Sequence, residues 1–277
     1  MPDRRLWRAN AHVAHSSLEG QVAGVPLTDG TRHQITKPVA NLLTAGNGKL
    51  DRQLLFGEAF QVLHTNNGFA FGFEPDTGFV GYIKETSLGS FVTPTHRIKT
   101  LGAQIYPSPD IKTTPIGWLP FAALVNGETS GDFFQLPDGG FLHQRHITPI
   151  ATYETDPITT AERLLDVPYL WGGDSNLGLD CSGLVHLSHK TCGQICPRDS
   201  DQQEEAFGTE LPDSSDLQRG DIVFWKGHVG LMQDADTLIH ANGYHMAVAS
   251  EPLETAVARI AKMGGGPITC RRRVKTA

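Results

Sequence analysis

The sequence lacks a long apolar run, a basic stripe and any dense set of cysteines. No apolar run approaches the ~20 residues that a membrane-spanning helix needs, so we expect no membrane partner. The net charge is −7 and basic residues form no stripe, which argues against nucleic acid as a partner. Because the chain of 277 residues has only four cysteines, we expect free thiols rather than disulfides.

The N-terminus also lacks the apolar core of a secretory signal peptide. Arg4, Arg5 and Arg8 are followed by polar residues between His12 and Glu19 that interrupt every short apolar stretch. The sequence therefore predicts a cytoplasmic protein, unless a leader has been removed.

What the sequence does contain indicates a turn-rich chain with much β structure and more than one domain. It has 30 glycines and 17 prolines, and its length suffices for two or three domains. Residues 1–35 are polar and irregular, and we expect them to pack on neighbouring domains. Residues 36–92 and 93–150 each predict a small β-barrel, and residues 151–277 predict a mixed helix and sheet domain.

The two predicted barrels share a pattern of short apolar segments at roughly ten-residue spacing. In the first barrel, Asn66-Asn67-Gly68 and Asp76-Thr77-Gly78 are hairpin signals between such segments. Each half also contains a Gly-aromatic-apolar triplet, Gly78-Phe79-Val80 and Gly140-Phe141-Leu142. We interpret this order as a degenerate internal repeat of one barrel type.

The last 127 residues predict a papain-like α+β arrangement. Asp156 and Pro157 form a helix start, and a second helix runs from Cys181 to about Cys192, with Gly193 as its stop. Antiparallel strands that carry histidines follow this helix. A nucleophile at the start of a helix, with histidines on later strands, is the order of papain-like enzymes.

Cys181 is the predicted nucleophile, and His228 is the predicted base. The start of a helix directs N–H groups and positive dipole at the sulfur, whereas the charge of Asp180 opposes a thiolate. We therefore expect His228 to supply most of the activation. The hairpin turn at Asp234–Asp236 brings His240 near His228, where it can orient the imidazole. Because His240 is a neutral orienter, we expect only modest dependence on it.

A second cluster, His186, His189, Cys192 and Cys196, could be interpreted as zinc ligands. Its spacing matches no common closed zinc site. We therefore expect buried small residues and helix-surface histidines, with neither a metal nor an organic cofactor in the protein.

Several motifs of the C-terminal half together resemble those of one family. Residues 150–270 resemble the NlpC-type cell-wall peptidases, papain-like cysteine endopeptidases that cut peptidoglycan stem peptides. The matching segments are Tyr169-Leu-Trp-Gly-Gly173, Asp180-Cys-Ser-Gly-Leu-Val185, Cys196-Pro-Arg-Asp-Ser-Asp-Gln202, Arg219-Gly-Asp-Ile-Val-Phe224, Gly227-His-Val-Gly230 and Leu238-Ile-His-Ala241. The region before them resembles the tandem bacterial SH3-like domains of γ-D-glutamyl-L-diamino acid endopeptidases of cell-wall recycling.

The resemblance implies a murein peptide with a free N-terminal L-Ala as substrate. It implies that Asp180, assisted by Ser182, binds the ammonium together with an acidic residue of the first barrel, for which Glu58 is the best candidate. It also implies an aromatic residue at that site, and either Phe79 or Tyr82 could occupy the position. Tyr82 could equally be an aromatic residue of a core strand.

The resemblance further suggests how the remaining subsites are built. Tyr169 and Trp171 would be walls of the pocket beside the sulfur. Asp199 and Ser200 could line a D-Glu subsite, although a helix N-cap explains them equally well. Arg198 is expected to brace that loop.

These features predict a monomeric cysteine endopeptidase. Its reaction would be hydrolysis of the bond from γ-D-Glu to the diamino acid, meso-diaminopimelate or Lys, in freed murein peptides. One alternative is a peptidoglycan-binding protein tethered by its SH3-like domains. Another is an acyltransferase that passes its thioester to an acceptor other than water.

Overall fold

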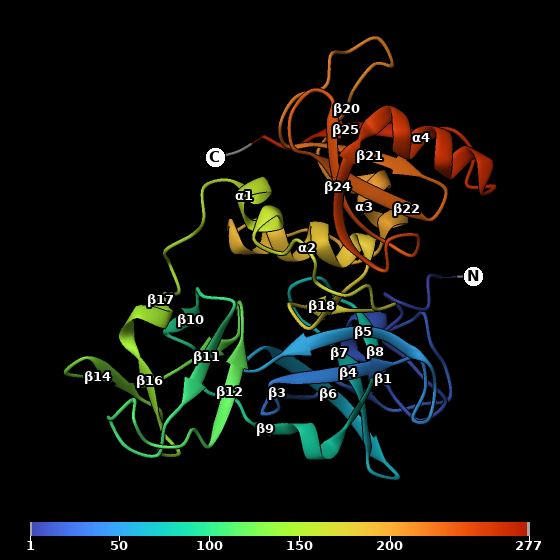
Figure 1. Ribbon diagram of the computed structural model, residues 1–277. Coiled ribbons are helices and arrows are strands. Elements are labelled where there is room, and N and C mark those ends of the chain that lie inside the picture. Colours follow the sequence, from blue (N-terminus) through green and yellow to red (C-terminus); the bar gives the residue numbers. More distant parts are fainter. Residues whose placement is uncertain (1, 276–277) are drawn as a thin grey trace. The chain divides into compact units, whose positions relative to one another are not determined.

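The computed structural model describes residues 2–275, which form two compact units that divide between Thr152 and Tyr153 (Figure 1). The sequence placed this boundary after residue 150. The finer division of the first unit into an extension and two barrels stays a prediction.

The first unit contains an antiparallel sheet of seven strands in the order β5-β4-β8-β7-β6-β3-β9. Apolar side chains of alternate strand positions, including Leu42, Phe60 and Ile83, form its core. The strands are β3 (Thr31–Ile35), β4 (Val39–Leu43), β5 (Leu50–Leu55), β6 (Ala59–Asn66), β7 (Phe69–Phe73), β8 (Val80–Lys84) and β9 (Leu88–Ser90). Strand β3 belongs to this sheet, although the sequence assigned its residues to the N-terminal extension.

The predicted turn at residues 66–68 joins β6 to β7. Asn67 and Gly68 have φ angles of 51° and 78°. Two successive left-handed residues form the primed turn whose twist matches that of the flanking strands, and Asn-Gly is the pair that tolerates it best.

Three smaller sheets follow within the same unit. They are ordered β13-β10-β17, β11-β12 and β14-β15-β16, and they share a core that includes Leu119, Phe134 and Leu142. The strands are β10 (His96–Ile98), β11 (Gly102–Ile105), β12 (Gly117–Pro120), β13 (Leu124–Val125), β14 (Glu128–Ser130), β15 (Phe133–Gln135), β16 (Phe141–His143) and β17 (Ile147–Pro149). Short elements complete the unit: β1 (Ala14–His15), β2 (Leu27–Thr28) and the 3₁₀ turns η1 (Ser16–Leu18), η2 (Glu85–Ser87) and η3 (Gln144–His146).

The second unit has an antiparallel sheet of six strands in the order β20-β25-β21-β22-β23-β24 (Figure 1). Its strands are β20 (Thr209–Glu210), β21 (Asp221–Trp225), β22 (His228–Met232), β23 (Thr237–Asn242), β24 (Ala247–Pro252) and β25 (Cys270–Arg273), and a small hairpin pairs β18 (Asp174–Ser175) with β19 (Gly178–Leu179). Its helices are α1 (Pro157–Glu162), α2 (Cys181–Thr191), α3 (Ser200–Ala206) and α4 (Leu253–Lys262).

The predicted helices that start near Asp156 and at Cys181, and the histidine-carrying strands after them, are confirmed. Asp156 caps α1 through bonds from the N–H groups of Ile158 and Thr159, and Pro157 occupies the first turn. The predicted α2 ends one residue before Cys192. Helix α4 packs its apolar side on the sheet face that carries Val223, Trp225, Met232 and Leu238. The unit is therefore the expected α+β fold, with its nucleophile helix before its histidine strands.

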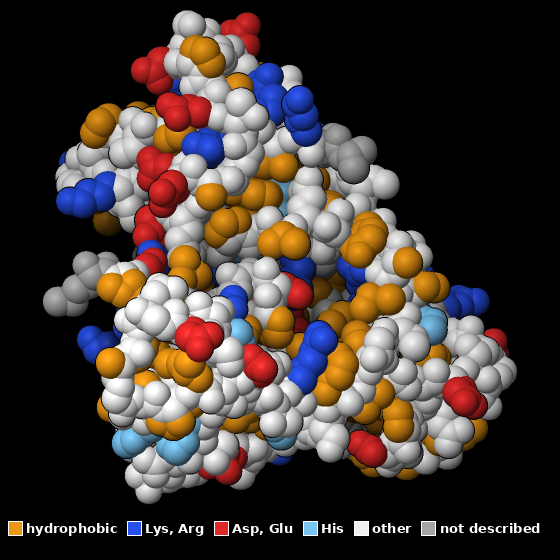
Figure 2. All heavy atoms as spheres, turned by 180° about the vertical axis from the view of Figure 1, so that it is seen from behind, with side chains coloured by type: hydrophobic (Ala, Val, Ile, Leu, Met, Phe, Trp, Pro, Cys, Tyr) orange, Lys and Arg blue, Asp and Glu red, His pale blue; other side chains and the backbone are white. Residues whose placement is uncertain are grey.

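All four cysteines are free thiols, as the composition predicted. Among residues 2–275, no helix is long and apolar enough to cross a membrane. Lysine and arginine side chains lie interspersed with aspartate and glutamate on the face shown in Figure 2. The absence of a nucleic-acid partner stays a prediction.

Candidate active site

Cys181 is the first residue of α2, and Asp180 is the residue that caps this helix. The Asp180 Oδ1 atom accepts a hydrogen bond of 2.7 Å from the Gly183 N–H. This bond satisfies one of the free N–H groups at the helix start and fixes the direction in which the first turn leaves the loop. The position of the sulfur thus depends on the residue before it.

Two motif glycines let the preceding loop approach this first turn closely. A Cβ atom on Gly183 would lie 2.2 Å from the carbonyl oxygen of Gly173. The Gly173 oxygen also accepts a bond of 3.2 Å from the Asp180 N–H. The Trp-Gly-Gly and Cys-Ser-Gly motifs are therefore two sides of one backbone contact.

The Asp180 carboxylate is bound from several sides by buried groups. Arg198, which is 1% exposed, donates to its two oxygens over 3.0 and 3.1 Å. The Gly172 N–H donates to Oδ2 over 2.8 Å, and the Ser182 hydroxyl lies 3.3 Å from Oδ1. Burial opposes the charge of Arg198, yet Asp180 and Asp174 together raise its pKa above the ordinary value. Arg198 is thus the buried counter-ion of Asp180.

The Cys181 thiol is held in its neutral form. Burial raises its pKa to about 12, and the charge of Asp180 acts in the same direction, as the sequence predicted. The backbone N–H groups of Val229 and Ser182 contact the sulfur and favour the thiolate, but less strongly. Because Val229 follows His228 directly, the thiol lies beside the start of β22.

The two predicted histidines lie next to each other on one face of the sheet. Leu231 pairs with Ile239 in the β22–β23 ladder, and the same register places His240 diagonally across from His228. The His228 Nε2 and His240 Nδ1 atoms are 2.8 Å apart. The hairpin therefore brings the two rings together in the way that the sequence predicted.

Both imidazoles are neutral at physiological pH. Burial lowers the pKa of His228 to about 3, and the neighbouring His240 and Arg259 add to this effect. Burial and Arg259 likewise lower the pKa of His240 to about 3. Within the described residues, Cys181 and His228 are not hydrogen-bonded to each other. The resting site is a thiol beside a neutral base, and catalytic hydrogen bonds often tighten only when substrate binds.

Tyr169 and Trp171 stand on the loop that precedes α2. Burial raises the pKa of Tyr169 above its usual range, and Cys181 is the next cause, which places the phenol near the sulfur. Trp171 is 71% exposed, so its ring is free to contact a ligand. Ser182 is buried and accepts a bond of 2.9 Å from Arg198.

The residues proposed for the D-Glu subsite lie at the start of α3. Asp199 is the cap residue of α3 and Ser200 is its first residue, but the Asp199 side chain makes no capping bond. Their position is therefore the helix start that was the alternative interpretation. Their part in substrate binding stays a prediction.

The candidates in the N-terminal unit occupy two different settings. Glu58 is 5% exposed, and its Oε2 atom accepts a bond of 2.9 Å from the Leu55 N–H. Tyr82 is half-buried; its ring packs against Phe71, and its hydroxyl lies 3.3 Å from the Asn10 amide. It borders a cavity of about 410 Å³. Phe79 is 1% exposed and belongs to the core, so Tyr82 is the one of these two aromatic candidates that a ligand could reach.

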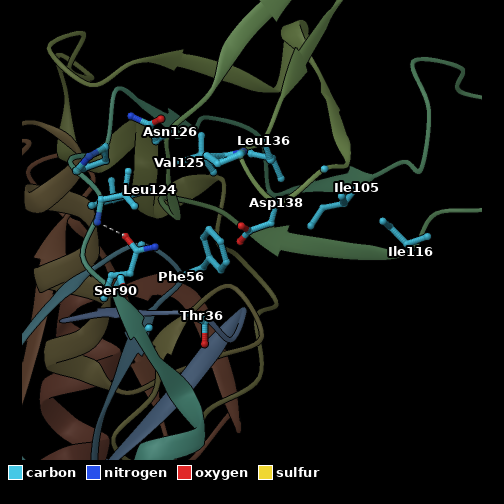
Figure 3. A pocket seen from close by; sticks show the side chains of 17 residues that line it. Thr36, Phe56, Ser90, Ile105, Ile116, Leu124, Val125, Asn126, Leu136 and Asp138 are labelled. Atoms are coloured by element: carbon cyan, nitrogen blue, oxygen red, sulfur yellow. Dashed lines mark hydrogen bonds between the residues drawn. The ribbon is translucent and has the colours of Figure 1, made fainter.

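A larger cavity of about 490 Å³ lies elsewhere in the N-terminal unit (Figure 3). Its wall is mainly apolar and includes Phe56, Leu124 and Leu136, while Asp138 supplies a carboxylate. None of the predicted site residues lines it.

The alternative zinc cluster does not assemble, and the expected surface positions of its histidines are wrong. His186 and His189 are 3% and 1% exposed. The His186 ring lies 3.0 Å from the Asp174 carboxylate, and the His189 ring lies 2.6 Å from the Gln194 amide oxygen. Polar partners inside the unit explain how both rings are buried, and these partners could not be recognised from helix periodicity.

Sequence reasoning missed one further member of the site. Glu251, on β24, accepts a hydrogen bond of 2.8 Å from His240. The sequence around Glu251 resembles no catalytic motif. Only the pairing of β23 with β24 shows that Glu251 lies next to His240.

A buried cysteine at a helix start, next to a pair of coupled histidines, defines the second unit as a thiol hydrolase of papain-like architecture. Comparison with known proteins agrees. Residues 166–261 match the NlpC/P60 family, and residues 42–88 match the bacterial dipeptidyl-peptidase SH3 domain. The C-terminal unit is thus an NlpC/P60 cysteine peptidase domain, and an SH3 domain precedes it.

Curated relatives include two γ-D-glutamyl-L-lysine dipeptidyl-peptidases. The one from Bacillus cereus is 33% identical over 140 residues, which are 48% of this chain and 40% of that protein. The one from Bacillus subtilis is 28% identical over 218 residues, which are 69% of this chain and 72% of that protein. The chain is homologous to these enzymes, although it spans well under two thirds of the first.

A solved NlpC/P60 family protein from Bacillus cereus has the same fold. The two structures superpose with a TM-score of 0.74 over 88% of this chain and 99% of that one, at 21% sequence identity.

Proposed function

We propose that the protein hydrolyses the γ-D-glutamyl–L-diamino acid bond of murein peptides that carry a free N-terminal L-Ala. The observation that carries the proposal is the neutral Cys181 thiol, placed at the start of α2 beside the paired imidazoles of His228 and His240. The names of the two Bacillus relatives support the choice of bond. We further propose that the reaction takes place in the cytoplasm, during recycling of cell-wall peptides.

In this proposal, substrate binding completes the alignment of the thiol with His228. The imidazole takes the thiol proton as sulfur attacks the amide carbon, and it returns the proton to the leaving amine. The Cys181 N–H lies at the helix start and helps to hold the oxyanion. Water then hydrolyses the thioester, with His228 again as base.

The resemblance assigned the substrate ammonium to Asp180 and Glu58, and the structure gives each carboxylate partners of its own. Arg198 already balances the charge of Asp180. We therefore propose Glu58 as the main partner of the substrate ammonium. Exchange of Glu58 for Gln tests this role. The variant should cleave the free peptide more slowly and the N-acetylated peptide at an unchanged rate.

The test is incubation with L-Ala-γ-D-Glu-meso-diaminopimelate and with the lysine analogue, followed by mass spectrometry of released L-Ala-D-Glu. Cys181→Ala is the inactive control. Both peptides left intact at high enzyme concentration would end the peptidase proposal. Equal rates on free and N-acetylated peptides would discard amine recognition and leave the nucleophile in place.

A further inference from the structure

Three polar side chains form a diagonal row across adjacent strands β22, β23 and β24. His240 lies diagonally across from His228, and the pairing of Leu238 with Glu251 places Glu251 diagonally across from His240 on the other side. We propose that Glu251 is a positioning residue that fixes the protons of both imidazoles and so holds His228 in its base form. This inference rests on the proposed function.

The row is continuous, and its inner members His240 and Glu251 are closed from solvent, whereas His228 is half-buried. The His228 Nε2 atom lies 2.8 Å from His240 Nδ1, and the His240 Nε2 atom lies 2.8 Å from Glu251 Oε1. The side chain of His240 is 0% exposed, and that of Glu251 is 9% exposed. Arg259, on α4, forms an ion pair with the same Glu251 oxygen. Because His240 is fully buried, water has little access to its two bonds, and each proton has a defined place.

The proton positions follow from the carboxylate at the end of the row. An ionised carboxylate only accepts hydrogen bonds, so His240 must carry its proton on Nε2. The Nδ1 atom of neutral His240 is then an acceptor, and His228 must donate to it from Nε2. The Nδ1 atom of His228 is left unprotonated, and this is the tautomer that can take a proton from Cys181. Without Glu251, both rings could adopt the opposite tautomers.

The carboxylate also matters after proton transfer. The imidazolium of His228 would stand next to neutral His240, which by itself stabilises the charge weakly. Glu251 is the group in this environment that favours the charged form of His228. The sequence predicted that His240 acts weakly because it is neutral. The structure adds that His240 is itself hydrogen-bonded to the Glu251 carboxylate.

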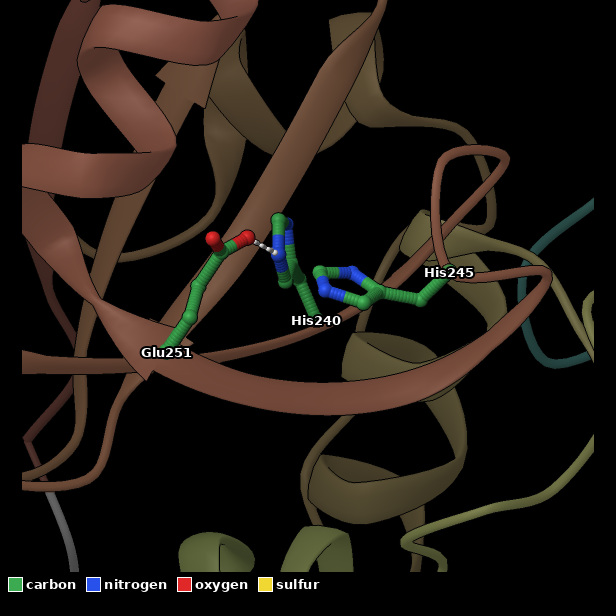
Figure 4. A group of neighbouring side chains, drawn as sticks. All are labelled: His240, His245 and Glu251. Atoms are coloured by element: carbon green, nitrogen blue, oxygen red, sulfur yellow. Dashed lines mark hydrogen bonds and ion pairs between the residues drawn. The ribbon is translucent and has the colours of Figure 1, made fainter.

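The cluster of His240, His245 and Glu251 also brings together side-chain types that bind divalent cations (Figure 4). In this cluster, however, Glu251 is paired with Arg259 and accepts from His240. His245 directs Nδ1 at the Asn242 amide oxygen over 3.0 Å. These contacts support a role for Glu251 in orientation rather than metal binding.

The test compares Glu251→Leu, which removes the acceptor, with Glu251→Gln, which keeps an acceptor oxygen and removes the charge. Glu254→Gln on α4 is the matched control, because Glu254 is exposed and its exchange for Gln removes the same charge. We expect Glu251→Leu to lower kcat about 10- to 100-fold with KM unchanged. Glu251→Gln should retain more activity, and the control should match the wild type. A kcat within twofold of wild type for Glu251→Leu overturns the proposal.

Two measurements on the full chain do not need the peptide. Nitrogen-15 NMR of histidine-labelled protein should show protonated Nε2 and bare Nδ1 in both His228 and His240, with the tautomers mixed or reversed in Glu251→Leu. The alkylation rate of Cys181 by iodoacetamide, followed by mass spectrometry, should fall in the same variant. Tautomers that stay unchanged in Glu251→Leu refute the positioning role of Glu251, even if the peptide is cleaved. If the tautomers are as expected but the peptide is not cleaved, the proposed substrate is wrong and the role of Glu251 stands.

Discussion

At the scale of single residues, the chemistry of this site depends on a buried Cys181 thiol and a half-buried His228 imidazole that are both neutral. Ion-pair formation between Cys181 and His228 is disfavoured before substrate arrives, because both charged forms are poorly solvated. The proton must therefore move during attack rather than beforehand. The same burial links the protonation of these groups to folding.

Stability should be greatest between about pH 6.5 and 8.5. The pKa values of His228 and His240 are lowered to about 3, so their contribution is complete above about pH 6.5 and is lost as the pH falls toward 3. The pKa of Cys181 is raised to about 12, so its contribution is present below pH 9 and is lost as the pH rises toward 12. Urea unfolding from pH 4 to 10 measures both limbs.

The variant Cys181→Ala isolates the alkaline limb, since it should weaken the fall in stability above pH 9. An identical fall in the variant would show that other groups cause it.

Exchange of Arg198 for Met should destabilise the protein by about 3–5 kcal/mol, because it leaves the buried Asp180 and Asp174 carboxylates without their counter-ion. Urea unfolding measures the change. Arg163→Met is the control: its ion pair with Glu154 is partly exposed, and its loss should change stability by less than about 1 kcal/mol. Similar losses for the two variants would contradict the role of Arg198.

At the scale of elements, the start of α2 is positioned by the contact between its first turn and the loop before it. Neither the loop nor the helix alone fixes the sulfur, because the cap, the glycine contact and Arg198 act on the same few atoms. A side chain added at either glycine of this contact should therefore lower activity and stability together.

The variant Gly183→Ala tests this contact. The added methyl group would lie 2.2 Å from the Gly173 carbonyl oxygen, so the helix start must shift, and we expect a loss of at least about 2 kcal/mol and most of the activity. Gly243→Ala is the control, since a Cβ atom there meets nothing within 4 Å. Thermal unfolding and peptide cleavage check both variants. A stable, active Gly183→Ala protein would refute the contact.

How far the sequence predicted these elements depends on the range of the signal. Caps, turns and alternation are local, so α1, α2 and the hairpin of His228 and His240 could be recognised in advance. Strand β3 was missed because its residues, Thr31–Ile35, are mostly polar, and only Ile35 is buried. The partners Arg198 and Glu251 could not be recognised, because each lies more than ten residues from the group it holds and depends on tertiary pairing.

At the scale of the whole molecule, the chain joins a unit that carries the predicted catalytic groups to a unit whose described elements are strands and short 3₁₀ turns. The cysteine, both histidines and their polar supports all belong to the second unit. The catalytic groups and any ligand-binding residues of the first unit thus belong to separate segments of the chain.

We expect the intact protein to be a monomer whose activity does not depend on metal. Light scattering during size exclusion should give a single mass near 30.1 kDa. Prolonged dialysis against EDTA should leave peptide cleavage unchanged, while iodoacetamide should abolish it. A dimer, or recovery of lost activity with Zn²⁺, would contradict these expectations.

The high pKa of the Cys181 thiol has a consequence for oxidative damage. Peroxides react with thiolates, and a sulfur that is protonated until substrate arrives presents little thiolate to them. An idle enzyme should therefore form sulfenic acid slowly, as dimedone labelling would show, and survive peroxide exposure that inactivates proteases with a permanent thiolate.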